Sequence, residues 1–156
     1  MEIRIEKGDL GSDTAAALIS ALNAELTERY PEPGDRSFRL DTEEVAPGRG
    51  AFFLAYVDSK AIGCGAIRRL TELEAEIKRM YVAPELRGRG IGRKLLDALE
   101  SEARALGVRR LVLETGERQP EAIALYQHAG FGFIPLFGEY IGKAISVCMG
   151  KELAEK

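Results

Sequence analysis

The residues best suited to chemistry form a glycine-rich, basic turn immediately before a strongly amphipathic stretch. The turn consists of Arg87, Gly88, Arg89, Gly90, Ile91, Gly92 and Arg93. A glycine turn that opens a helix directs free backbone N–H groups at one point, where the helix dipole also attracts negative charge. Glycine leaves the main chain open to a close ligand, and arginine binds phosphate oxygens. The pattern therefore predicts a phosphate or pyrophosphate site, with a solvated glycine-rich turn as the alternative.

A dinucleotide-binding turn is a second interpretation of the same glycines. Glu114 closes a predicted strand 24 residues beyond Gly90, where such folds place an acid that binds a ribose hydroxyl. Two features argue against this interpretation. The position that needs the third glycine is Arg93, and the preceding strands form a hairpin meander rather than the first strand of a βαβ unit.

The elements that must position this turn follow in the order β-α-β-β-β-α-β-α-β-β. Hydrophobic periodicity predicts strands at 2–6, 51–57, 61–69, 73–82, 109–114, 131–134 and 144–149, and helices at 12–29, 90–106 and 120–129. This order requires a mixed, mostly antiparallel central sheet with helices on both faces, which is a three-layer α/β fold. Because the chain has 156 residues, we expect residues 1–156 to form a single domain.

Composition argues against several classes of function. The net charge of −3 gives no electrostatic footprint for nucleic acid, and no apolar run is long enough to span a membrane. The N-terminus has no apolar segment of the secretory type, so a cytoplasmic location is expected. One histidine and two distant cysteines predict no metal site. We expect Cys64 and Cys148 to be buried, reduced thiols and His128 to be a surface residue.

Three motifs in register resemble the GNAT superfamily of acetyl-CoA-dependent N-acetyltransferases. The turn at 87–92 (RGRGIG) is similar to the family's Q/R-x-x-G-x-G/A signature, and residues 80–84 (MYVAP) are similar to the strand exit that precedes it. Residues 122–126 (AIALY), followed by 129–131 (AGF), resemble its A-x-x-L-Y-x-x-x-G-F box. The predicted order of elements is also that of the family. The resemblance covers residues 1–150 and implies a GNAT-like three-layer fold.

The resemblance implies an enzyme that moves the acetyl group of acetyl-CoA directly to a primary amine in a ternary complex, without a metal. It places the pyrophosphate of acetyl-CoA on residues 87–93 and the pantetheine arm between two splayed strands, beside Met80 and Val82. Tyr126 matches the general acid that protonates the departing thiolate, and Gln119 stands where many members have a cofactor-contacting asparagine. Two alternative functions stay open: a catalytically silent acetyl-CoA-binding regulator or partner-binding module, and an acyltransferase that uses a longer acyl-CoA or an unusual acceptor.

A general base is also needed, because an ammonium substrate must lose a proton before it attacks. Strict alternation along the predicted strand places Glu76 on the face shared by Met80 and Val82, so we expect its carboxylate to face the cofactor. Histone-acetylating members of the superfamily have a catalytic glutamate at the same spacing, eleven residues before the turn begins. The alternatives are Glu114 or ordered water as the base, and an ion pair with Arg68 or Lys78 as the role of Glu76.

The acceptor site is expected to be built by residues 22–42 and 135–143, which lie on the substrate side in this family. They offer the polar and aromatic side chains Tyr30, Asp35, Arg36, Arg39, Phe137, Glu139 and Tyr140. Arg36 or Arg39 is a candidate for binding a substrate carboxylate. With no basic patch and no appended domain, we expect the partner to be a small-molecule amine rather than nucleic acid, a membrane or chromatin. A homodimer through the final strands, which is common in the superfamily, is compatible with the sequence.

Overall fold

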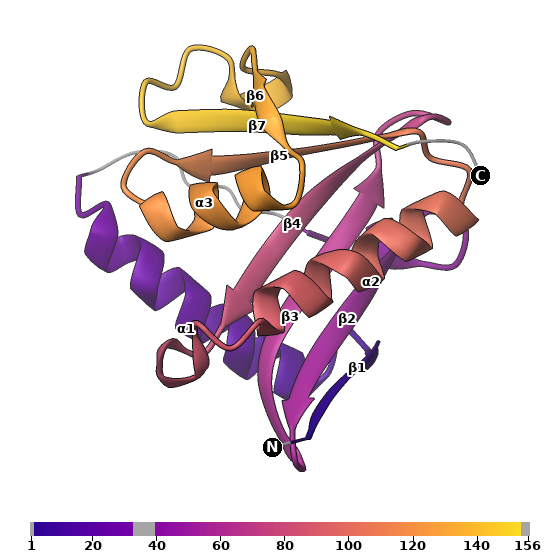
Figure 1. Cartoon of the computed structure of the whole chain (residues 1–156), viewed down its shortest axis with the longest axis vertical. Helices are drawn as coiled ribbons and strands as arrows, with labels where there is room; N and C mark the ends of the chain where they lie inside the picture. The colour runs from indigo at the N-terminus through magenta and orange to yellow at the C-terminus, as the bar shows by residue number, and fades with distance from the viewer. Residues whose placement is uncertain (1, 33–39, 154–156) are drawn as a thin grey trace.

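A seven-stranded sheet with helices on both faces forms the body of the molecule (Figure 1). The computed structural model describes residues 2–32 and 40–153. The strands are β1 Ile3–Lys7, β2 Gly50–Val57, β3 Lys60–Arg69, β4 Glu74–Val82, β5 Arg110–Gly116, β6 Gly132–Ile134 and β7 Ser146–Glu152. The helices are α1 Asp13–Arg29, α2 Ile91–Ala105 and α3 Pro120–His128, with short 3₁₀ helices η1 Thr42–Val45, η2 Pro84–Leu86 and η3 Gly138–Tyr140. The predicted order of helices and strands is confirmed.

The strands lie in the order β1-β2-β3-β4-β5-β7-β6, and in the described residues every neighbouring pair is antiparallel except β4–β5. Helix α1 packs on one face of the sheet through Leu18, Leu22 and Leu26, whereas α2 and α3 pack on the other. Each face therefore has its own apolar core. The expected three-layer α/β fold with a mixed, mostly antiparallel sheet is confirmed.

Local sequence signals place the two longer helices. The Ser12 side chain accepts a hydrogen bond from the amide of Ala15 (3.1 Å) and so caps α1. Helix α2 presents an apolar stripe that includes Leu95 and Leu99 to the sheet. Gly107 follows the last turn of α2 with φ +79, a conformation that glycine adopts without strain. The glycine-rich turn therefore sits at the N-terminus of a firmly packed helix.

The expected alternation along β4 is wrong, because this strand carries a β-bulge. The register with β3 shifts after Lys78, so that Arg79 and Met80 lie opposite a single residue of β3. Arg79 has φ +60, a left-handed conformation that is uncommon for residues other than glycine. As a result, Glu76 and Lys78 face α1. Met80 and Val82, beyond the bulge, face α2 instead.

Strands β4 and β5 pair over only part of their length. Parallel pairing joins residues 74–77 to residues 110–113, and beyond these residues the two strands diverge (Figure 1). The later part of β5 continues to pair with β7, so the β5-facing edge of β4 is open from Lys78 onward in the described structure. The expected splaying of two adjacent strands is confirmed.

Neither cysteine nor the single histidine lies in a setting that suggests catalysis. Cys64 and Cys148 are free and buried, as expected, and burial raises the pKa of the Cys64 thiol to about 12. His128 is exposed in the last turn of α3, also as expected.

Within residues 2–32 and 40–153, no three His, Cys, Asp or Glu side chains gather as metal ligands would. None of the helices in these ranges is long and apolar enough to cross a membrane.

Candidate active site

The glycine-rich turn leads directly into the first turn of α2. Gly90 precedes the helix with φ +81, and Gly88 has φ +79. A Cβ atom at either position would meet no atom within 4 Å, so the space beside both glycines is open. The first amides of the helix, which begin with Ile91 and Gly92, have no intrahelical partner. An open, glycine-lined helix N-terminus of this kind can hold a phosphate group.

Arg87 and Arg93 both contact other protein groups. The Arg87 Nε donates to the carbonyl of Val82 (2.8 Å) and its Nη2 to Glu25 (2.7 Å), which ties the turn to β4 and α1. Arg93 forms an ion pair with Asp97 one turn further along α2, with 3.1 Å between Nε of Arg93 and Oδ1 of Asp97. Arg89 is exposed. Arg87 therefore fixes the position of the turn, and the backbone amides are the expected phosphate ligands.

A cavity of about 280 Å³, the turn cavity, extends from this turn along β4 to α3. It brings together all the predicted cofactor-binding residues except Arg89: Met80, Val82, Arg87, Gly88, Gly90, Ile91, Gly92, Arg93, Gln119 and Tyr126. These residues come from β4, the glycine-rich turn and α3, which are separate in the sequence. The divergence of β4 from β5 is what opens the space between them.

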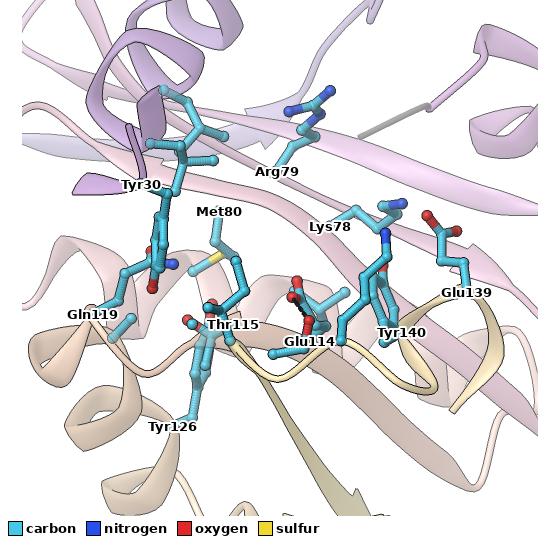
Figure 2. Close-up of a pocket in the computed structure, with 18 residues that line it drawn as sticks. Tyr30, Lys78, Arg79, Met80, Glu114, Thr115, Gln119, Tyr126, Glu139 and Tyr140 are labelled. Atoms are coloured by element: carbon cyan, nitrogen blue, oxygen red, sulfur yellow. Dashed lines mark hydrogen bonds between the residues drawn. The ribbon is translucent and has the colours of Figure 1, made fainter. Parts of the chain in front are cut away.

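A second cavity of about 150 Å³, the charged cavity, adjoins the turn cavity (Figure 2). The two cavities share Leu22, Met80, Gln119, Ala122 and Tyr126. Polar and charged side chains supply much of the remaining lining: Tyr30, Lys78, Arg79, Glu114, Thr115, Glu139, Tyr140, Lys143 and Ser146. The site is therefore a two-armed space whose arms meet beside Met80 and Tyr126.

Tyr126 of α3 stands where the two cavities meet. Its side chain is buried and packs edge-on against Phe131, with 5.8 Å between the ring centroids. Burial, with a smaller contribution from the charge of Glu114, raises the pKa of Tyr126 above its usual value. The hydroxyl therefore keeps its proton at neutral pH and can donate it to an anion that develops in the cavity.

Glu114 lies in the charged cavity, on β5 just beyond the residues that pair with β4. Its carboxylate accepts a hydrogen bond from Ser146 Oγ of β7 (2.8 Å). Burial raises the pKa of Glu114 to about 7, although the Ser146 hydrogen bond and the charges of Lys78 and Lys143 act to lower it. A carboxyl group with a pKa near neutrality is suited to act as a general base at physiological pH.

Glu76 is buried behind the charged cavity, with 1% of its surface exposed, and is not among the residues that line the cavity. Arg68 donates to its Oε1 from both Nε (3.0 Å) and Nη2 (2.9 Å). The Tyr140 hydroxyl donates to its Oε2 (2.6 Å). Both carboxylate oxygens are therefore engaged. The ion pair with Arg68, one of the sequence-based alternatives, is present, and the role of Glu76 as a base stays a prediction.

Replacing Glu76 by glutamine should lower the free energy of unfolding by about 3 kcal/mol, because Arg68 would lose its buried partner. Arg68 also pairs with the more exposed Glu44 (2.7 Å), and such pairs contribute at most about 1 kcal/mol. Glu44→Gln is therefore the matched control, with an expected loss below that value. Urea unfolding followed by circular dichroism measures both, and equal losses would contradict a dominant role for the buried pair.

The structure also locates the residues predicted for the acceptor side. Three of them line the charged cavity: Tyr30, Glu139 and Tyr140. Phe137 packs edge to face on the Tyr140 ring, with 5.3 Å between the centroids, and so supports the wall from behind. The remaining three, Asp35, Arg36 and Arg39, lie outside the described residues.

Sequence reasoning did not single out five polar residues that line the charged cavity: Lys78, Arg79, Thr115, Lys143 and Ser146. Unbroken alternation along β4 would place Lys78 on the same face as Met80, but the β-bulge turns Lys78 toward α1. Lys143 and Ser146 reach Glu114 because β7 pairs with β5, in a register that begins with Ser146 opposite Gly116. This pairing joins distant parts of the chain, and no local sequence signal identifies it.

Known proteins resemble this chain in sequence and in fold. Residues 15–131 match the family model described as Acetyltransferase (GNAT) family. The chain is 40% identical over 142 residues to a protein named IAA acetyltransferase from Azospirillum brasilense, which covers 90% of this chain and 92% of that protein. A solved Klebsiella pneumoniae structure assigned to the acyl-CoA N-acyltransferases has a TM-score of 0.83 at 34% identity and covers 97% of this chain and 98% of that one. A GNAT family acetyltransferase from Elizabethkingia anophelis, solved with acetyl-CoA bound, shares the fold with a TM-score of 0.68 at 22% identity, over 97% and 98% of the two chains.

Proposed function

The chain belongs to the GNAT acetyltransferase family, and on that premise we propose that it transfers the acetyl group of acetyl-CoA directly to a primary amine of a small molecule. The observation that carries the proposal is the meeting of two cavities beside Met80 and Tyr126. The turn cavity has the glycine-lined helix N-terminus that suits a pyrophosphate. The charged cavity holds a carboxylate and other polar groups that suit an amine. A thioester at the junction would lie within reach of both.

In this proposal residues 87–93 bind the pyrophosphate through main-chain amides, and the open edge of β4 binds the pantetheine arm as an added strand. Met80 and Val82 lie along that arm, and Gln119 faces it from the start of α3. Acetyl-CoA, when bound, supplies the acetyl thioester. A main-chain N–H at the open β4 edge would stabilise negative charge on the acetyl oxygen during transfer.

Glu114 and Tyr126 then move the protons. Glu114 accepts the proton that the ammonium loses, and the free amine nitrogen then forms a bond to the acetyl carbon as the carbon–sulfur bond breaks. Tyr126 donates a proton to the departing sulfur and regains one from the second proton that the nitrogen loses as the amide forms. The products are an acetamide and the free thiol of CoA. Glu114 is favoured as the base because it lines the cavity with a pKa of about 7. Glu76 is the second candidate, acting through a water, although both of its oxygens already accept hydrogen bonds.

A thiol-release assay tests the proposal, with acetyl-CoA offered to a panel of amines, amino acids and peptides. Calorimetry alongside it measures the binding of acetyl-CoA. Release above the hydrolysis background, with the acetylated amine identified by mass spectrometry, would support the proposal. Tight binding without release across the panel would favour the catalytically silent acetyl-CoA-binding regulator. Absence of binding would overturn the assignment of the turn as a phosphate site.

Replacing Gly90 by valine should weaken acetyl-CoA binding by about 10–100-fold, because a branched side chain would project into the open space beside the helix N-terminus. Gly107→Val is the matched control: Gly107 adjoins the other end of α2 with a similar φ of +79, against +81 at Gly90, and its Cβ would also meet no atom within 4 Å. Both variants should lose comparable stability. Calorimetry should show weakened binding in Gly90→Val alone, and unchanged affinity in that variant would refute the phosphate site.

A further inference from the structure

The charged cavity contains two lysines, Lys78 and Lys143, to which the proposed acetyl transfer gives no role. Figure 2 shows Glu114 between Tyr126, toward one side of the view, and Lys78 with Glu139, toward the other. Lys143, which lies between η3 and β7, lines the same cavity, and its charge and that of Lys78 both act on Glu114. The Lys78 ammonium therefore lies beyond the proposed base, on the side away from the junction with the turn cavity, and Lys143 is a second cation in the lining of the same cavity.

The proposed chemistry determines where the acceptor must extend. Its nitrogen has to approach a thioester beside Met80 and Tyr126, and it also has to lie within reach of Glu114. The turn cavity is then filled by the pantetheine arm, so the rest of the acceptor extends into the charged cavity, toward Lys78 and Lys143. The charges of these lysines therefore determine which groups the rest of the acceptor can carry.

Lys78 is an uncommon residue for such a position, because only 7% of its surface is exposed. The negative charges of Glu76 and Glu139 and the positive charges of Arg68 and Arg79 all act on Lys78. Burial lowers the pKa of Lys78, and the charge of Glu76 opposes that effect. A buried ammonium in this setting gains stability from a further anion placed within reach.

We propose that Lys78 and Lys143 bind a carboxylate of the acceptor, and that the acceptor is a small amino carboxylate whose amine and carboxylate are a few bonds apart. The inference rests on the proposed function, because acetyl transfer is what fixes the nitrogen beside Glu114. The volume of about 150 Å³ fits this class, since sites for drug-sized ligands span about 300–1,000 Å³.

The test compares a panel of α-, β- and γ-amino acids, each with its carboxamide, as acceptors in the thiol-release assay. The wild-type enzyme should show a kcat/KM about 10–100-fold higher for the carboxylate form, as expected for charge-assisted hydrogen bonds. Lys78→Gln should raise KM for that form by a similar factor and raise KM for the carboxamide much less, so that the ratio of the two kcat/KM values falls toward one. Lys143→Gln provides a second variant from a loop, and Lys60→Gln, exposed at the start of β3, is the control that should change neither.

Binding of the N-acetylated products separates this inference from the proposed function, because it requires no turnover. Calorimetry with CoA-loaded protein compares each N-acetyl amino acid with its carboxamide. Tighter binding of the carboxylate form, lost in Lys78→Gln or Lys143→Gln, would support the carboxylate site even if no transfer were detected. Transfer and product binding that are equal for carboxylate and carboxamide would overturn the inference and leave the proposed function standing. Acetylation confined to amines without a nearby carboxylate would also overturn it.

Discussion

Replacing Glu114 by glutamine should lower kcat by about 10²–10³-fold, because general-base catalysis contributes on this scale and glutamine cannot accept the proton. The affinity for acetyl-CoA should stay within about twofold, since Glu114 lines the charged cavity and not the turn cavity. Glutamine keeps an oxygen that can accept the hydrogen bond from Ser146 Oγ. Steady-state kinetics with saturating acceptor, together with calorimetry for acetyl-CoA, measures both effects.

The pH profile identifies which carboxylate is the base. Burial raises the pKa of Glu114 in the free enzyme to about 7, and a base is active only when it is deprotonated, so the kcat/KM of the wild-type enzyme should rise with pH through about 7. This rising limb should be absent from the residual activity of Glu114→Gln. A limb that persists in Glu114→Gln and disappears in Glu76→Gln would assign the role to Glu76 instead.

The raised pKa of Glu114 can be checked without any substrate, through the pH dependence of stability. The folded-state pKa of about 7 lies above the ordinary value of 4.5, so the unfolded chain loses its proton first as the pH rises. The contribution of Glu114 to stability is therefore complete below pH 4.5 and is lost by the time the pH has risen through 7. Relative to wild type, Glu114→Gln should gain about 3 kcal/mol between pH 4 and pH 8. A constant difference in unfolding free energy would mean that the carboxyl titrates normally.

Elements with strong local signals could be predicted from the sequence, and the one local failure has a physical cause. The cap at Ser12 and the apolar stripe of α2 are encoded within a few residues, and both helices form where expected. The alternation of β4 fails at Arg79, because a bulge depends on the register with β3 rather than on β4 alone. Because of that single extra residue, Glu76 and Met80 lie on opposite faces of the sheet, whereas unbroken alternation predicts that they share one face.

In the candidate site too, the parts encoded by local motifs could be predicted, and the parts that depend on long-range contacts could not. The glycine-rich turn and Tyr126 belong to contiguous motifs, and the structure places both on one two-armed space. The surroundings of the two carboxylates depend on long-range contacts. Glu114 meets Ser146 only through the pairing of β5 with β7, and Glu76 is covered by Tyr140 from the segment that precedes β7. The burial of each carboxylate and its hydrogen-bond partners determine which one can act as a base. Neither property can be predicted from the spacing of residues along the chain.

Tyr126→Phe should lower kcat by about 10²-fold, because the hydroxyl that protonates the departing thiolate would be lost. The phenyl ring would keep its edge-on packing against Phe131, so the free energy of unfolding should change little. The affinity for acetyl-CoA should stay within about twofold, since the substitution removes a proton donor and leaves the phosphate-binding turn intact.

Tyr56→Phe provides the matched control for this substitution. Tyr56 lies on β2, where its ring packs beneath the Arg4 guanidinium 4.6 Å from the centroid, and it lines neither cavity in the described structure. Loss of its hydroxyl should leave kcat unchanged. An unaltered kcat in Tyr126→Phe would remove Tyr126 as the acid. A weakened affinity for acetyl-CoA that accounts for the whole loss of kcat/KM would instead make the hydroxyl a binding group. A fall in kcat at constant affinity, absent from the Tyr56 control, is the result that proton donation at the junction of the two cavities requires.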